Sequence, residues 1–111
     1  MFSPCWEGAS KEHPELEKYG YIYPSEAESM MDSGELKDLC SVAAMIHVGK
    51  ILEKMRVIVY TMSINRKDTE TLGFEYAPNP QKAVDMALEG AGSSPEVLAF
   101  KRAAEIVPRI R

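Results

Sequence analysis

The chain has 111 residues, of which 45% are hydrophobic, and a formal net charge of -4. This length suits one domain that can bury a core, but it is small for a complete α/β enzyme. The acidic balance argues against a nucleic-acid partner, because phosphate binding needs clustered Lys and Arg. No apolar run approaches the ~20 residues that a membrane span needs, so no membrane partner is expected.

The first residues have the character of a strand end. Met1–Cys5 has the character of the last part of a strand whose beginning is missing, so we expect the chain to be part of a longer protein. Met1–Cys5 lacks the basic start and apolar core of a signal peptide. Cys5 and Cys40 have no metal-type spacing, which favours free thiols in a cytoplasmic protein.

A short helix and an extended segment are expected next. Pro14 to Tyr19 can form the helix, and Tyr19, Tyr21 and Tyr23 alternate with smaller or apolar residues in a brief extended stretch. Two interpretations of the three tyrosines stay open. They pack a loop against the domain surface, or they form an aromatic strip that faces a ligand.

Two helices are predicted in the middle of the chain. The first runs from Ser25 to Ser33, where Ser25 and Glu28 have the spacing of a capping box. The second runs from Glu35 to Met55, and its centre, Leu39 to Val48, is apolar nearly all round. A helix of this kind is buried on more than one side, so we expect it between a sheet and a further layer, which another part of the protein could supply.

A strand, a helix and a second strand are expected from Arg56 onward. Arg56–Thr61 is a compact apolar, β-branched run, typical of a strand. Asn65–Leu72 is helix-permissive and stops at Gly73 with Phe74 behind it, which is the expected pattern of a helix end. The second strand would occupy the short interval between this stop and Asn79.

A longer helix and a third strand complete the pattern. Asn79 is a good N-cap, and Pro80 suits the first helical position. One helix face is predicted to contact the sheet through Ala83, Val84, Ala87 and Leu88. After it, Val97–Phe100 is typical of a strand buried on both faces.

Strands that alternate with helices pair in parallel and need cover on both faces. Residues 1–111 therefore predict a single, small three-layer α/β/α domain with a mostly parallel sheet, like half of a Rossmann fold. Ligands of such folds gather beyond the carboxyl ends of the strands.

The stretch Cys5–Lys11 is the local motif with chemical potential. It resembles the thiolate loop of cysteine-dependent phosphatases and phosphotransfer domains, which bind phosphate through backbone N–H groups. Two features argue against this function. Lys11 stands where a planar guanidinium is needed, and Glu7 adds negative charge to an anion site.

Neither histidine indicates a catalytic centre by sequence. His47 lies in the most apolar helix, where a packed core role is expected over that of a ligand or base. His13 stands between acidic residues in a polar loop, which predicts a solvated side chain. No Cys, His and carboxylate set has metal-site spacing, and no dinucleotide, Walker or nucleophile-elbow motif is present. No catalytic residue and no metal ligand is assigned.

Several pieces taken in order carry a resemblance. They are the opening strand end with its Cys5–Ala9 turn, the helix Leu39–Leu52 leading into Arg56–Val59, Leu72–Phe74 with Ala77, the helix residues Gln81–Ala83 and Ala87–Leu88, and then Gly92, Val97–Leu98 and Pro108. In this order and spacing the chain resembles the C-terminal domain of nickel-dependent lactate racemase and its relatives.

The resemblance implies a two-domain enzyme that binds lactate or another 2-hydroxy acid between its domains. A nickel pincer nucleotide takes a hydride from the substrate C2 and returns it to either face. In that family the cofactor lysine, the metal-binding histidine and the catalytic histidines belong to the N-terminal domain, and none of them matches a position here. This chain would close the cleft, against an N-terminal domain of the same or a partner chain, and would be inactive alone.

The resemblance also indicates where a substrate would touch this chain. The family turn reads Asp-Gly-x-Gly, and here the sequence is Glu7-Gly8-Ala9-Ser10. We expect substrate contacts from Glu7, Gly8 and Ser10, with a tight turn and a purely structural Gly8 as the alternative. A helix position that is aromatic in the racemase is Ala43 here, so the substrate is left open. A non-catalytic α/β interaction module is the alternative function, and a phosphotransfer domain is the third.

Overall fold

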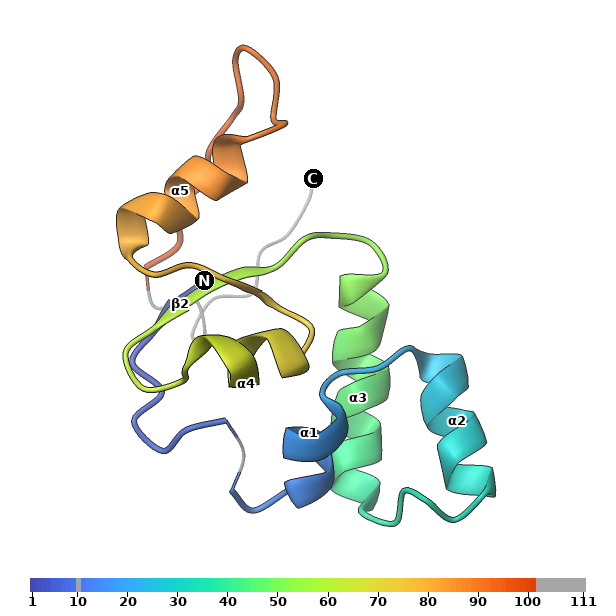
Figure 1. The fold of residues 1–111 in the computed structure, drawn as a ribbon. Coiled ribbons are helices and arrows are strands. Elements are labelled where there is room, and N and C mark those ends of the chain that lie inside the picture. Colours follow the sequence, from blue (N-terminus) through green and yellow to red (C-terminus); the bar gives the residue numbers. More distant parts are fainter. Residues whose placement is uncertain (10, 102–111) are drawn as a thin grey trace.

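The structure of the protein, a computed structural model, describes residues 1–9 and 11–101. Three helices follow the first strand, and strands and helices alternate only from the second strand onward (Figure 1). In order they are β1 (Phe2–Ser3), α1 (Pro14–Tyr19), α2 (Pro24–Asp32), α3 (Leu39–Leu52), β2 (Ile58–Thr61), α4 (Arg66–Thr71), β3 (Glu75–Tyr76) and α5 (Pro80–Leu88). The fold is therefore mixed α/β.

The described strands form one small parallel sheet in the order β1-β2-β3. β1 pairs with the second half of β2, with Phe2 opposite Tyr60, whereas β3 pairs with its first half, with Ile58 opposite Glu75. The backbone carbonyl of Ile58 also accepts a hydrogen bond from the amino group of Met1 at 2.6 Å. The predicted strand character of the first residues and the parallel pairing are confirmed. The predicted arrangement of three layers is not established by the described residues.

The predicted helix end at Gly73 and the predicted N-cap at Asn79 are both confirmed. The Asn65 side chain accepts from the Asp68 N–H at 2.9 Å, and the Asn79 side chain accepts from the Lys82 N–H at 2.8 Å. At the end of α4, Gly73 has φ 85°, its N–H donates to the Glu70 carbonyl, and the Phe74 N–H donates to the Thr69 carbonyl. This pair of bonds is the Schellman arrangement, which satisfies the last carbonyls of a helix.

The starts of α2 and α3 differ from the prediction. No capping box forms at Ser25, because Pro24 occupies the first helical turn and Tyr23 becomes the N-cap, without a side-chain cap bond. Proline suits this position because its φ is already helical. α3 begins at Leu39 rather than Glu35, since the Asp38 side chain accepts from the Cys40 N–H at 3.0 Å and so fixes the helix start.

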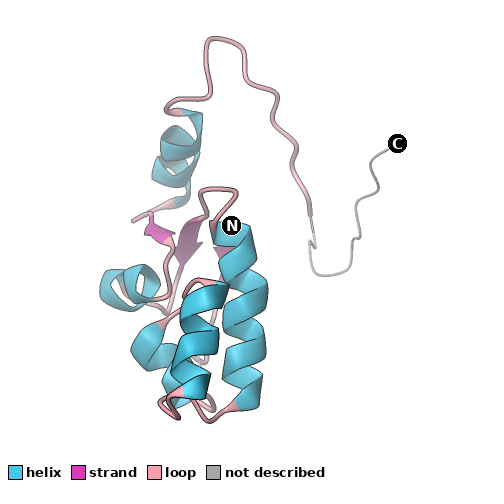
Figure 2. Ribbon diagram, turned by 90° about the vertical axis from the view of Figure 1, so that its right-hand side faces the viewer, coloured by secondary structure: helices cyan, strands magenta, loops and turns pink. Residues whose placement is uncertain are grey.

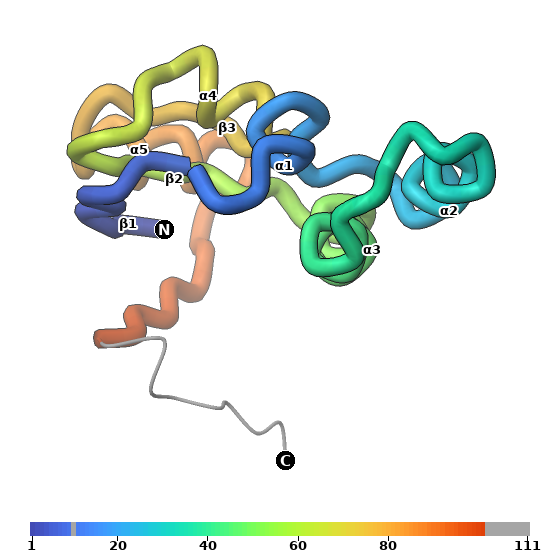
Figure 3. The backbone as a smooth tube through the Cα atoms, turned by 90° about the horizontal axis from the view of Figure 1, so that it is seen from below, coloured from blue at the N-terminus to red at the C-terminus, as the bar shows by residue number. Residues whose placement is uncertain are grey.

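The main core lies among the helices. Figure 3 shows α3 and α2 to one side of the strands, with α1 between them and the sheet. The buried apolar cluster consists of Leu16, Ala27, Leu36, Val42, Met45 and Leu72. The buried face of α3 thus includes Met45, and His47 lies about 200° further round the helix. His47 is exposed, as is Ala43, so the prediction of a packed core histidine is wrong.

The C-terminal part of the described chain carries little buried surface. Of the predicted α5 contact face only Ala83 is buried, against β2, while Val84 and Leu88 are each 41% exposed. The strand predicted at Val97–Phe100 is absent, because this stretch belongs to a long loop beyond α5 and the Val97 and Leu98 side chains are 76% and 77% exposed (Figure 2). An apolar run becomes a strand only beside a partner, and the outer strands have only two residues each.

Two glycines let the segment between α1 and α2 pass close to two other helices. Gly20 has φ 71°, and a Cβ there would overlap the backbone carbonyl of Thr71 at the end of α4. A Cβ at Gly49, inside α3, would likewise overlap the backbone carbonyl of Ile22. Both approaches depend on the missing side chain, so this segment is held from two sides.

Gly20→Ala and Gly34→Ala form a matched pair that tests this contact. Both glycines have positive φ, but a Cβ at Gly34 meets nothing within 4 Å. We expect Gly34→Ala to lower the free energy of unfolding by about 1 kcal/mol through backbone strain alone. Gly20→Ala should cost about 2–4 kcal/mol, because steric overlap adds to the same strain. Urea unfolding measures both, and equal losses would show that the close approach is unimportant.

Candidate functional site

A tight turn follows β1 at its carboxyl end. The Gly8 N–H donates to the Cys5 carbonyl at 3.0 Å, which closes the turn Cys5–Gly8. Gly8 has φ 85°, a conformation that glycine adopts without cost. Cys5 has φ 45°, where a side chain is strained, and such outliers are concentrated at functional sites. The structure therefore contains the tight turn that the sequence suggested, with Gly8 in its left-handed position.

The same turn lines a cavity of ≈ 570 Å³. Its lining residues are Trp6, Glu7, Gly8, Ala9, Lys11, Glu12 and His13. The structure thus brings Glu7 and Gly8, two of the three expected contact residues, to a cavity beyond the carboxyl end of a parallel strand. Ligands of open α/β sheets gather at this edge. The third residue, Ser10, lies outside the described residues.

His13 is partly exposed, as the sequence suggested, but its ring is also held by Asp38. Its Nδ1 lies 2.7 Å from Asp38 Oδ2, and the same oxygen accepts a hydrogen bond from the Ser41 hydroxyl at 2.7 Å. The Ser41 residue is 1% exposed. His13 was missed because its partner is distant in sequence, although Asp38 followed by Ser41 before an apolar helix is a recognisable N-cap signal.

The Asp38 carboxylate is strongly stabilised in its charged form. The Ser41 hydroxyl first, then the His13 ring and the backbone N–H groups of Cys40 and Ser41, lower the pKa of Asp38 from 3.8 to about 2. Hydrogen bonds donated to a carboxylate favour its ionised form and outweigh its partial burial. A charged acceptor therefore stands beside Nδ1 of His13 at every physiological pH.

The remaining walls of the cavity combine an aromatic ring with charges of both signs. Trp6 is the only tryptophan of the chain, and 71% of it is exposed. Glu7 and Glu12 contribute carboxylates and Lys11 contributes an ammonium group. These groups can accept hydrogen bonds from hydroxyls, pair with a carboxylate and cover an apolar carbon face.

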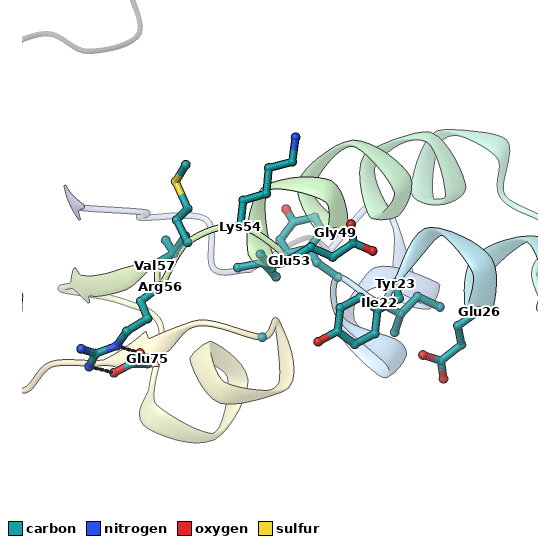
Figure 4. Close-up of a pocket in the computed structure, with 13 residues that line it drawn as sticks. Ile22, Tyr23, Glu26, Gly49, Glu53, Lys54, Arg56, Val57 and Glu75 are labelled. Atoms are coloured by element: carbon teal, nitrogen blue, oxygen red, sulfur yellow. Dashed lines mark hydrogen bonds and ion pairs between the residues drawn. The ribbon is translucent and has the colours of Figure 1, made fainter.

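A second cavity of ≈ 630 Å³ lies near the amino ends of β2 and β3. Figure 4 shows Tyr23 and Glu26 on one side of it and Arg56 with Glu75 on the other. Tyr21 also lines this cavity, so the tyrosine segment does face an open space. Burial raises the pKa of Tyr21, whose ring packs against Phe74 with centroids 5.4 Å apart.

Two of the charged side chains that line this second cavity, Arg56 and Glu75, pair with each other. Arg56 Nε and Nη2 both donate to the Glu75 carboxylate at 2.7 Å, a bidentate pair that lowers the pKa of Glu75 and raises that of Arg56. The cavity also lies at the edge of the sheet opposite to the one where ligands of these folds bind. We therefore take the cavity beside β1 as the candidate site.

The thiol and metal chemistry considered from the sequence is not assembled here. Cys5 is partly buried, its Sγ donates to the Ser3 hydroxyl at 3.2 Å, and it lines neither cavity. The part of the chain that the structure describes holds no group of three or more His, Cys, Asp or Glu side chains that could bind a metal ion. These residues do not fit the nickel cofactor that the resemblance implies, so no step through it is assigned to this chain.

Comparisons with known proteins add no relative. No protein-family model matches the chain, and neither the curated proteins nor the solved structures contain a match. Across residues 1–9 and 11–101, no helix is both long enough and apolar enough to cross a membrane. The functional argument therefore depends on the residues of the site.

Acid titration tests the Asp38 network. Because the pKa of Asp38 is lower in the folded chain than its ordinary 3.8, the carboxylate stabilises the fold fully above that value. This stabilisation is lost as the pH falls through about 2, where the folded form takes up the proton. The free energy of unfolding should decrease between pH 5 and pH 2, and Asp38→Asn should flatten this slope. Glu28→Gln, on exposed α2 surface, is the matched control, and an unchanged slope in Asp38→Asn would contradict the assignment.

Proposed function

We propose that this chain is the cleft-closing domain of a lactate racemase-like enzyme that acts on a 2-hydroxy acid. An N-terminal catalytic domain, in the same or a partner chain, would hold the nickel pincer nucleotide and the groups that perform the chemistry. The chain alone would be inactive. Its free cysteines agree with a cytoplasmic location, which belongs to the same proposal.

One observation supports this function best. The turn that the resemblance marks as a substrate contact follows the carboxyl end of β1, and Glu7 and Gly8 line a cavity there. A turn with a purely structural role needs neither a cavity nor charged side chains around it. The cavity offers Glu7, Lys11 and His13, polar groups that suit a small ligand bearing a hydroxyl and a carboxylate.

Exposed apolar side chains support a partner domain. Phe2 in β1 is 58% exposed, Met62 directly after β2 is 64% exposed, and Leu88 at the end of α5 is 41% exposed. Large apolar side chains exposed around a sheet are typical of surfaces that another domain covers. The three-layer, Rossmann-like arrangement would then be completed by that partner.

The same exposed side chains also favour the alternative function, a non-catalytic interaction module. The two functions differ at the cavity. A racemase domain needs Glu7 and Gly8 for turnover, whereas an interaction module needs only the apolar surface. Nickel content and racemase activity of the assembled protein therefore separate them.

Co-production with a lactate racemase-like N-terminal domain tests the proposal. The host must make the pincer cofactor and be supplied with nickel. We expect the purified complex to interconvert the D and L forms of a 2-hydroxy acid, followed by chiral chromatography, and this chain alone to be inactive. Glu7→Gln should slow the complex by about tenfold or more, because misplaced substrate contacts reduce turnover steeply.

Glu28→Gln is the control for that experiment, since Glu28 is exposed on α2 and far in sequence from the turn. A nickel-loaded complex without racemase activity towards lactate or longer 2-hydroxy acids would contradict the proposed function. Stable association of the two domains without nickel or activity would favour the interaction module.

A further inference from the structure

We propose that His13 is a ligand-binding residue of the cavity beside β1 and that Asp38 is its positioning residue. His13 Nε2 would accept the hydrogen bond of a ligand hydroxyl. The choice of a 2-hydroxy acid as ligand rests on the proposed function, whereas the roles of His13 and Asp38 rest on the geometry of the site.

The two ring nitrogens of His13 have different surroundings. Nδ1 lies 2.7 Å from Asp38 Oδ2, and the ring lines the cavity. Among the described residues, the hydrogen bonds of the ring involve Nδ1 alone. Nε2 is therefore the nitrogen left to a ligand, and the side chain of His13, 38% exposed, is reachable from solvent.

The Asp38 carboxylate decides which proton the ring carries. A carboxylate accepts and never donates, so the neutral ring holds its proton on Nδ1 and presents a lone pair at Nε2. Asp38 is itself fixed, because its side chain accepts from the Ser41 hydroxyl and the Cys40 N–H at the start of α3. The imidazole thus has a defined tautomer and orientation before any ligand binds, as in carboxylate–histidine pairs generally.

The other groups around the ring complement a hydroxy acid. Lys11 offers an ammonium group to the ligand carboxylate, and Glu7 and Glu12 can accept from further hydroxyls. Trp6 provides an apolar wall for carbon atoms. Other elements add further charged residues around His13. The Glu15 carboxylate of α1 accepts from the Asp38 N–H at 3.0 Å, the Glu17 N–H donates to the His13 carbonyl, and Lys37 precedes Asp38 in the chain.

Binding is measured through Trp6, whose fluorescence is the only tryptophan signal of the chain. The full chain is titrated with lactate and with the longer 2-hydroxy acid gluconate at pH 8. His13→Asn keeps an amide N–H that can reach Asp38 but removes Nε2. We expect it to weaken binding of the responding acid about five- to tenfold, with the urea midpoint unchanged.

Three further variants separate binding from folding. Asp38→Asn should weaken binding similarly and reverse the tautomer, seen as a change in the ring ¹⁵N shifts of His13. Ser41→Ala should lower stability through the lost hydrogen bond, with binding less affected than in His13→Asn. His47→Asn, at the exposed histidine of α3, should change neither quantity.

Three results would overturn the inference. Wild-type affinity in His13→Asn, or a His13 ring protonated on Nε2 in the wild-type chain, would remove the assigned role. Absence of binding of both acids to the wild-type chain would do the same. None of these results decides the proposed function, because racemase activity of the two-domain complex is measured separately.

Discussion

A single carboxylate, that of Asp38, connects the candidate site to the helical core. It ends the loop after α2, caps α3 through the Cys40 N–H, and binds both the Ser41 hydroxyl and the His13 ring. α3 carries much of the buried apolar surface, so the position of this helix and the orientation of His13 depend on the same group. These hydrogen bonds also lower the pKa of Asp38.

The sequence predicted local structure well at some helix starts and ends, where particular residue types are strongly preferred. Gly73 and Asn79 were correctly assigned because caps and helix ends depend on neighbours a few residues away. The prediction failed where distant contacts decide. Val97–Phe100 has the composition of a buried strand, yet no described strand pairs with it, and composition alone cannot supply a pairing partner.

The sequence identified some residues of the candidate site and missed others. Glu7 and Gly8 were identified through the turn and the resemblance, and the cavity supports that choice. His47 was wrongly assigned to the core, and the contact of His13 with Asp38 was not foreseen. Burial of a lone histidine depends on its angle round the helix and on partners from other elements, such as Asp38, 25 positions further along the chain.

The close backbone approaches at Gly20 and Gly49 have a consequence for how the molecule can move. The segment from Gly20 to Ile22 contacts the end of α4 on one side and the last turn of α3, at Gly49, on the other. These contacts involve backbone atoms, which cannot yield by changing rotamer. Because these contacts tie the segment to both helices, we expect α1, α3 and α4 to open together as one cooperative unit in hydrogen exchange.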